Sequence, residues 1–210
     1  FITGKKVPGI DVGPWAEADY DVILIDEKGT ETLAREFAKE LKPGDCYYLR
    51  GNVGSGKTVF SRAFVREAYE DDTVSVTSPT FTLVNVYDDL EAAPPIHHYD
   101  LYRIQNLDQL SRLNLGETLP KVVSLIEWPE AVDKREAVEE RLELWFETVS
   151  EDEIELEIER DTEVEPEEGS EYEDLLPRRV KFFVIGNTWR DRLERVMDRV
   201  AQMDEADTME

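Results

Sequence analysis

The stretch YYLRGNVGSGKTVFSRAF, residues 47–64, restricts the fold of this chain more than any other part of the sequence. An apolar, β-like run and a helix-like run flank a glycine-rich turn that matches G-x-x-x-x-G-K-[ST] in full. Glycines let the backbone wrap so closely that consecutive N–H groups point at a phosphate, and the helix N-terminus adds its positive dipole end. The motif therefore predicts a nucleoside triphosphate site at a strand–loop–helix junction.

The residues of this loop have separate expected roles. Lys57 is expected to reach the β- and γ-phosphates, and the Thr58 hydroxyl is expected to ligate Mg²⁺. The remaining predicted contacts to the nucleotide come from the loop itself, residues Asn52, Val53, Gly54, Ser55 and Gly56. A nucleoside triphosphate and Mg²⁺ are thus the predicted ligands.

A second acidic group should complete such a site, because most P-loop enzymes also hold Mg²⁺ through an acidic residue at the end of a buried strand. Glu127 directly follows the uninterrupted apolar run VVSLI, and Asp100 lies inside IHHYDLY. Both are candidates, and a plain surface carboxylate is the alternative for each.

Three further residues near these runs have two interpretations each. His98 shares a predicted strand face with Asp100 and is more often a hydrogen-bonded core residue than a catalyst. Thr80, in the loop before a strand, is a candidate switch residue that senses the γ-phosphate, or part of a turn. Trp128 is a candidate to stack on adenine, or a core residue.

The pattern along the chain predicts an α/β fold of P-loop NTPase type, with three layers, a mostly parallel central sheet and antiparallel edge strands. Short apolar runs predict buried strands at 21–25, 46–50, 96–102 and 122–126, and a β-like run covers 81–87. Strict alternation beyond Pro129 predicts half-exposed antiparallel strands, with apolar residues at 142, 144, 146, 154, 156, 158, 180, 182 and 184. Helices are predicted at about 30–41, 57–69 and 106–114, and a short one ends near Val200.

This pattern divides the chain into five parts. Residues 1–20 are an N-terminal extension, residues 21–148 the P-loop core, and residues 149–177 an acidic, partly disordered insertion. Residues 178–200 return a strand and a helix to the core, and residues 201–210 form a polar tail.

The net charge of −25 is concentrated in one segment. Glu151 to Leu175 holds 14 acidic residues and one basic residue, Arg160, a local charge of −13. The chain has no extended basic stripe of the kind that neutralises phosphates, so any RNA is expected to be held by another protein.

Composition also limits the setting of the chain. Cys46 is the only cysteine, which excludes disulfides and cysteine zinc sites and fits a reducing compartment. No apolar run approaches the roughly 20 residues of a membrane span, so no membrane partner is expected. A cytoplasmic location is predicted; because residue 1 is Phe, an organelle matrix or stroma after removal of a targeting peptide is the alternative.

Motifs of other P-loop classes are missing or weak. The N-K-x-D string with which GTPases read guanine does not occur, and the arginines are scattered rather than gathered in a kinase-type lid. A small-molecule P-loop kinase and a nucleotide-dependent binding module with negligible hydrolysis both stay open as alternatives to a hydrolase.

Four motifs in order carry a family resemblance: GNVGSGKT, VTSPTFTLVNVY, HHYDLYRI and SLIEWPE. Together they resemble the TsaE family, small P-loop ATPases of tRNA threonylcarbamoyladenosine biosynthesis. The resemblance covers about Asp21 to Glu130 and returns more loosely at RRVKFFVIG. It implies an ATPase that is weak alone and acts on a TsaB–TsaD complex, which modifies the adenosine beside the anticodon. The tRNA is then contacted only indirectly.

The resemblance also implies roles for single residues. Lys57 and Thr58 hold phosphate and Mg²⁺, Glu127 completes the metal site, and Asp100 supports water activation or metal positioning. Thr80 is switch-like, and Trp128 and Thr30 lie near the ATP. Where bacterial members usually have Asp-Leu-Gly-Ala this chain has Asn-Val-Gly-Ser, residues 52–55, so altered hydrogen bonding within the loop is expected.

Overall fold

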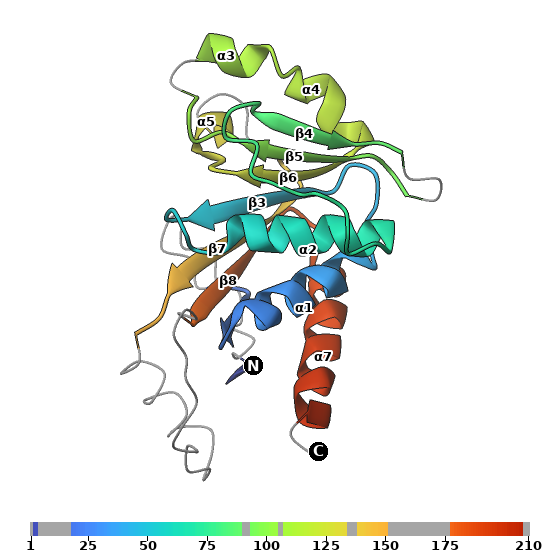
Figure 1. Ribbon diagram of the computed structural model, residues 1–210, viewed down its shortest axis with the longest axis vertical. Helices are drawn as coiled ribbons and strands as arrows, with labels where there is room; N and C mark the ends of the chain where they lie inside the picture. Colours follow the sequence, from blue (N-terminus) through green and yellow to red (C-terminus); the bar gives the residue numbers. More distant parts are fainter. Residues whose placement is uncertain are drawn as a thin grey trace.

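The computed structural model describes residues 2–3, 18–89, 93–104, 107–133, 138–150 and 177–207. Within these residues one eight-stranded sheet is flanked by helices, in the strand order β1-β2-β8-β7-β3-β6-β5-β4 (Figure 1). The strands are β1 (Ile2–Thr3), β2 (Tyr20–Leu24), β3 (Cys46–Gly51), β4 (Val84–Tyr87), β5 (Ile96–Asp100), β6 (Val123–Glu127), β7 (Arg141–Thr148) and β8 (Arg178–Ile185). The helices are α1 (Glu27–Ala38), α2 (Lys57–Tyr69), α3 (Leu107–Ser111), α4 (Leu115–Thr118), the 3₁₀ turn η2 (Leu119–Lys121), α5 (Glu130–Asp133) and α7 (Arg190–Asp207).

The centre of the sheet is parallel and its outer strands are antiparallel. Strands β7, β3, β6 and β5 are parallel neighbours, whereas β4 pairs antiparallel with β5 and β8 pairs antiparallel with both β7 and β2. Every residue of β6 is buried, as expected for an apolar run between two parallel neighbours. This arrangement confirms the predicted fold class.

Helices cover both faces of the sheet, which makes three layers. On one face α1, α2 and α7 pack on a core that includes Phe37, Phe60, Leu125 and Val196. On the other face the short helices α3 and α5 and the turn η2 cover β3, β5 and β6 (Figure 1). Cys46 is fully buried in this second cluster, as predicted for a strand residue.

The predicted elements differ from the observed ones at several places. The helix predicted at about 30–41 lies three residues earlier, at Glu27–Ala38, and the helix predicted at about 106–114 ends at Ser111. The run at 81–87 becomes a strand only at Val84, because the Leu83 amide donates to the Pro79 carbonyl at 2.7 Å and closes a turn in which Leu83 has a φ of 67°. Helix α7 does not end near Val200 but continues to Asp207. Four of the seven residues added there are polar and Met203 is 38% exposed, so the apolar spacing that predicted the helix ends before the helix itself.

Some predictions fall outside the described residues. The alternating residues 154–158 and the acidic segment 151–175 lie there, as do most of the N-terminal extension and residues 208–210. The proposed division into five parts therefore stays a prediction. Of the extension, Ile2–Thr3 pairs antiparallel with β2 and so adds a strand to the sheet.

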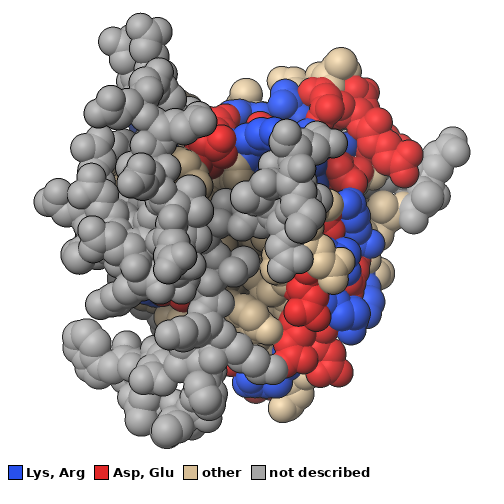
Figure 2. All heavy atoms as spheres, turned by 90° about the horizontal axis from the view of Figure 1, so that it is seen from below, with Lys and Arg blue, Asp and Glu red and all other residues tan. Residues whose placement is uncertain are grey.

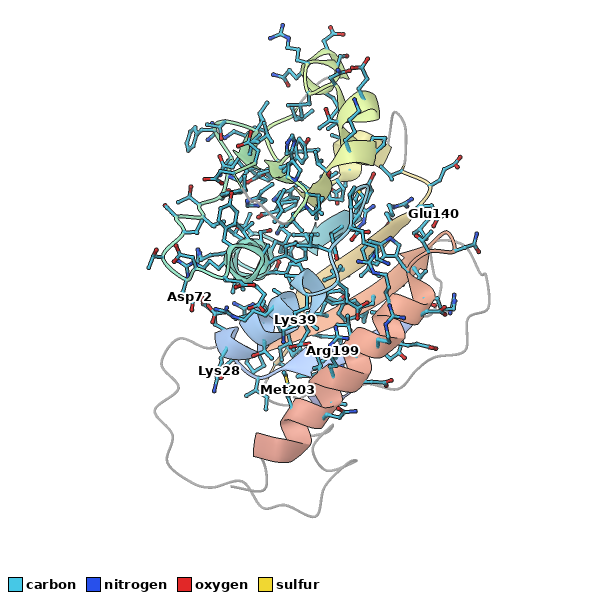
Figure 3. All side chains as sticks on the ribbon, turned by 90° about the vertical axis from the view of Figure 1, so that its right-hand side faces the viewer. Lys28, Lys39, Asp72, Glu140, Arg199 and Met203 are labelled. Carbon is cyan, nitrogen blue, oxygen red and sulfur yellow. The ribbon has the colours of Figure 1, made fainter. Side chains whose placement is uncertain are left out.

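Helix α7 is attached to the rest of the fold by arginines. The Arg192 guanidinium donates two hydrogen bonds to the Asp45 carboxylate, both 2.7 Å, and a third to the Glu40 carbonyl. Burial alone would lower the pKa of Arg192, but the hydrogen bonds and charge of Asp45 raise it. Two turns along, Arg199 reaches Glu36 and Glu40 of the α1 region, where it lies close to Lys39 (Figure 3).

Charges of both signs lie side by side on the face that Figure 2 shows. On the described residues of this face, groups of Asp and Glu adjoin groups of Lys and Arg. Among the described residues, no helix has the length and apolar character needed to cross a membrane.

Replacing Arg192 with Met should destabilise the fold by about 3 kcal/mol, because removing one partner leaves the buried Asp45 carboxylate without its countercharge. Chemical denaturation followed by circular dichroism measures this. The matched control is Arg195→Met one turn further along, since Arg195 pairs with Glu40 at the surface and should contribute far less. If both variants lost the same free energy of unfolding, the buried Arg192–Asp45 pair would not contribute more than the exposed Arg195–Glu40 pair, and the prediction would be wrong.

Candidate nucleotide site

The glycine-rich loop lies between the end of β3 and the start of α2, as the motif predicts. Gly51 and Gly56 adopt φ values of 133° and 105°, which favour glycine. A Cβ on Gly51 would lie 2.3 Å from the Phe146 carbonyl oxygen and 2.7 Å from Ser55 Oγ. Only glycine therefore lets the loop leave β3 so close to β7.

Lys57 is the first residue of α2 and its side chain folds back along the loop. Its Nζ donates to the carbonyl oxygens of Gly51 and Asn52, each at 2.7 Å, and lies 4.3 Å from the centre of the Trp128 ring. Burial lowers the pKa of Lys57, although the charges of Glu127 and Asp100 oppose that shift. The ammonium group thus lies within the loop, beside the two candidate acidic residues.

Thr58 and Glu127 are brought together from separate elements. The Thr58 hydroxyl, in the first turn of α2, donates to Glu127 Oε1 at 2.9 Å, and Glu127 ends β6. The same carboxylate oxygen lies 2.8 Å from His98 Nε2 of β5. Since a carboxylate accepts, Nε2 carries the proton in this pair. His98 is fully buried, and because its Nδ1 has no hydrogen-bond partner among the described residues, its side-chain polar contact there is with Glu127.

Asp100 lies beside Glu127, because the two residues are register partners at the ends of parallel strands β5 and β6. Its Oδ2 accepts hydrogen bonds from the hydroxyls of Ser78 and Thr80, and its Oδ1 accepts from the Tyr102 amide at 3.1 Å. Both oxygens of a carboxylate that is only 3% exposed are therefore hydrogen-bonded. The predicted switch residue Thr80 contacts the predicted catalytic residue Asp100 directly.

Trp128 directly follows Glu127, the last residue of β6. It has a positive φ of 57°, uncommon for a bulky residue. Its ring packs at 4.9 Å from that of Tyr102, itself 58% exposed, and over the Lys57 ammonium. Trp128 thus packs against the Lys57 ammonium and lies outside both core clusters, and its contact with adenine stays a prediction.

The other predicted contacts are spread around the loop. Ser55 is buried and its Oγ lies 3.5 Å from Lys57 Nζ, whereas Val53 is 76% exposed at the tip. Gly54 also has a positive φ, and its carbonyl accepts from Arg178 of β8. Thr30 is buried in α1, whose helix packs along α2 (Figure 1), and its contact with the nucleotide stays a prediction.

On the opposite face of the sheet an ion-pair cluster supports the base of the loop. Arg50, directly before Gly51, donates to Glu143 at 2.7 Å and to Glu130 at 3.2 Å. Burial would raise the pKa of Glu143, but Arg50 and Arg141 lower it below its ordinary value. The start of the loop is therefore held on both faces of the sheet. Close packing at Gly51 holds it on one face, and the ion pairs of Arg50 hold it on the other.

The residues fit MgATP, judged by the chemistry of their donor groups. A hydroxyl and a carboxylate that already touch can act as two oxygen ligands, and Mg²⁺ usually takes one or two protein ligands beside phosphate and water. In the part of the chain that the structure describes, no cluster of three or more His, Cys, Asp or Glu offers an all-protein cage.

Two partners were not predicted from the sequence. The Ser78 hydroxyl donates to Asp100, and the hydrogen bond of His98, a buried core residue as predicted, is to Glu127. The spacing His98-x-Asp100 on one strand face was the available signal for His98. No local pattern distinguished Ser78 from an ordinary turn residue.

The chain is similar to proteins of one family. Curated relatives named "tRNA threonylcarbamoyladenosine biosynthesis protein TsaE" include those of Rickettsia felis, Streptomyces coelicolor and Bacillus subtilis, at 37%, 38% and 32% identity. The matches cover 53%, 53% and 63% of this chain and 63%, 74% and 80% of the respective relatives.

A solved structure has the same fold. The crystal structure of Bacillus subtilis YdiB superposes with a TM-score of 0.56 over 88% of this chain and 95% of that chain, at 22% sequence identity. The family model described as "Threonylcarbamoyl adenosine biosynthesis protein TsaE" matches residues 24–162, and these residues contain the glycine-rich loop, Asp100, Glu127 and Trp128. By this match over most of its length, the chain belongs to the TsaE family.

Proposed function

We propose that this chain is a Mg²⁺-dependent ATPase that supports the formation of threonylcarbamoyladenosine in tRNA. One observation carries the proposal: Thr58 touches Glu127, and Asp100 lies next to Glu127, all beside a phosphate loop with a buried lysine. The pathway comes from the names of the curated relatives.

Each side chain has a part in this proposal. The loop amides and Lys57 bind the phosphates of ATP, while Thr58 and Glu127 hold Mg²⁺. The metal, when bound, neutralises charge on the phosphate oxygens as the terminal phosphate departs. His98 holds the same Glu127 oxygen, Oε1, that accepts from Thr58, and so fixes the carboxylate next to the first turn of α2.

Asp100 orients the attacking water in this proposal. A carboxylate at the end of a buried strand, beside the metal ligand Glu127, is suitably placed to accept a proton from water. Ser78 and Thr80 hold its Oδ2 from the loop that precedes β4, so the position of that loop determines the orientation of the base. Thr80 thereby links the γ-phosphate to the base.

The partners belong to the proposal as well. A chain of net charge −25, with mixed charges on the face of Figure 2, is poorly suited to bind tRNA directly. We therefore propose that it acts in the cytoplasm on a TsaB–TsaD-type complex, which holds the tRNA. Its turnover is slow alone and increases when the complex binds.

Phosphate release from MgATP tests the proposal. The chain alone should release phosphate slowly, and addition of a TsaB–TsaD complex from the same source should raise the rate by about tenfold or more. Lys57→Ala serves as the blank, since it removes the cation that contacts the phosphates. Bound ATP with no release in either condition would favour a binding module, and release that requires a small-molecule acceptor would favour a kinase.

Asp100→Asn should reduce turnover by about 100-fold or more, because the amide cannot accept the proton, while ATP affinity changes little. Stopped-flow phosphate detection and calorimetric titration with ATP measure the two effects separately. Asp108→Asn, on the exposed surface of α3, is the matched control and should leave both unchanged. Normal turnover in Asp100→Asn would remove Asp100 from the mechanism.

Glu127→Gln should raise the Mg²⁺ concentration required for half-maximal activity by about tenfold, because a charged metal ligand becomes a neutral one. Binding of ATP in the presence of EDTA should be retained, which separates a metal defect from a folding defect. The control is Glu117→Gln, at an exposed position of α4. An unchanged Mg²⁺ requirement would argue against Glu127 as a metal ligand.

A further inference from the structure

The segment that leads from α2 to the Ser78–Thr80 loop has no regular secondary structure over residues 74–79, yet it is held in place. We call residues 74–80 the approach segment. Two arginines of α2 bind its backbone: Arg66 Nε donates to the Val74 carbonyl and Arg62 Nε donates to the Val76 carbonyl, both at 3.2 Å. The two arginine side chains thus donate hydrogen bonds to backbone carbonyls, as the backbone amides of a neighbouring strand do in a sheet.

The spacing of these two bonds follows from helix and strand geometry. Arg62 and Arg66 are four residues apart on a helix, a rise of about 6 Å. Val74 and Val76 are two residues apart on an extended chain, a length of about 6.6 Å. The two distances are nearly equal. Residues spaced by four along α2 can therefore each bond every second residue of the approach segment.

The direction of the pairing leads to the nucleotide site. The residue numbers rise along the approach segment as they fall along α2, so the segment runs antiparallel to the helix, toward the phosphate loop. One further step of the same size brings Ser78 level with Thr58. The observed contacts agree, because Ser78 bonds Asp100, and Asp100 is the register neighbour of Glu127, which accepts from Thr58.

Contacts with the core and with β4 also hold the approach segment in place. The Val76 side chain is buried in the main core, and Asn85 Nδ2 of β4 donates to the Thr77 carbonyl at 2.9 Å. These contacts hold the segment between α2 and the sheet edge. The arginine bonds differ in that their donors belong to the helix that begins at the phosphate loop.

We propose that Arg62 and Arg66 are positioning residues of the nucleotide site. They fix the position of the approach segment along the axis of α2 and so place Ser78 and Thr80 at Asp100. The proposal rests on the proposed function, in which Thr80 senses the γ-phosphate. Neither arginine touches the loop that binds phosphate; each acts through the backbone of the approach segment.

The test compares Arg62→Met, Arg66→Met and the double variant with the unchanged protein. Met keeps an apolar stem and removes the donor. Hydrogen–deuterium exchange over residues 77–83 should become about tenfold faster in the double variant, while exchange in α2 and the unfolding midpoint change little. Arg195→Met is the matched control, since Arg195 lies on α7 and pairs with Glu40.

A second readout depends on the γ-phosphate. The affinity for a non-hydrolysable ATP analogue, divided by the affinity for ADP, should fall roughly fivefold, because only the triphosphate reaches Thr80. A purely structural role would weaken both ligands equally. Arg62→Lys keeps a cationic donor and should restore part of the ratio.

The outcomes separate this proposal from the proposed function. Unchanged exchange over 77–83, or equal weakening of both ligands, would overturn the positioning role even if the chain hydrolyses ATP. If the chain hydrolyses no ATP but exchange and the affinity ratio change as stated, the positioning role stands and the proposed hydrolysis fails. Should the double variant not fold, each single variant is expected to give the same two changes at smaller size.

Discussion

The hydrogen bond between Thr58 and Glu127 is the contact on which the organisation of this site depends. It joins the first turn of α2 to the last residue of β6, and those two elements carry the phosphate loop and the acidic group. Because parallel strands end at one edge of the sheet, Asp100 of β5 lies at the same level as Glu127. His98 then holds Glu127 from within the sheet, so one carboxylate receives bonds from both its neighbouring strand and its helix.

Charge is concentrated at this edge in a way that is costly without a ligand. Two carboxylates, Asp100 and Glu127, are almost fully buried, with one buried ammonium, that of Lys57. Burial of such groups is tolerated when their polar atoms are hydrogen-bonded, and here hydroxyls, an imidazole and main-chain groups provide the bonds. In the proposed function, binding of a magnesium–phosphate complex would exchange these neutral partners for a divalent cation and phosphate oxygens.

The sequence predicted the parts of the site that are built locally. The loop, α2 and the buried strand before Glu127 follow from glycine spacing and apolar runs, and all were found at or within one residue of their predicted bounds. The contacts of Ser78 and His98 could not be found in this way, because they join residues 22 and 29 positions apart. The end of α7 was predicted too early for a related reason: the apolar spacing is not continued beyond Val200, and apolar periodicity detects only the part of a helix that packs.

The approach segment connects these observations to function. A segment bound to its neighbours by a backbone ladder would be as rigid as the sheet and could not respond to a ligand. Held instead by single bonds from Arg62, Arg66 and Asn85, it has a defined position and few contacts to break. The turn that the Leu83 amide closes on the Pro79 carbonyl begins at the end of the segment, and the positive φ of Leu83 lies three residues beyond it. A γ-phosphate that draws Thr80 away from Asp100 would thus move a short segment while α2 and the sheet stay fixed, and free the carboxylate only when ATP is bound.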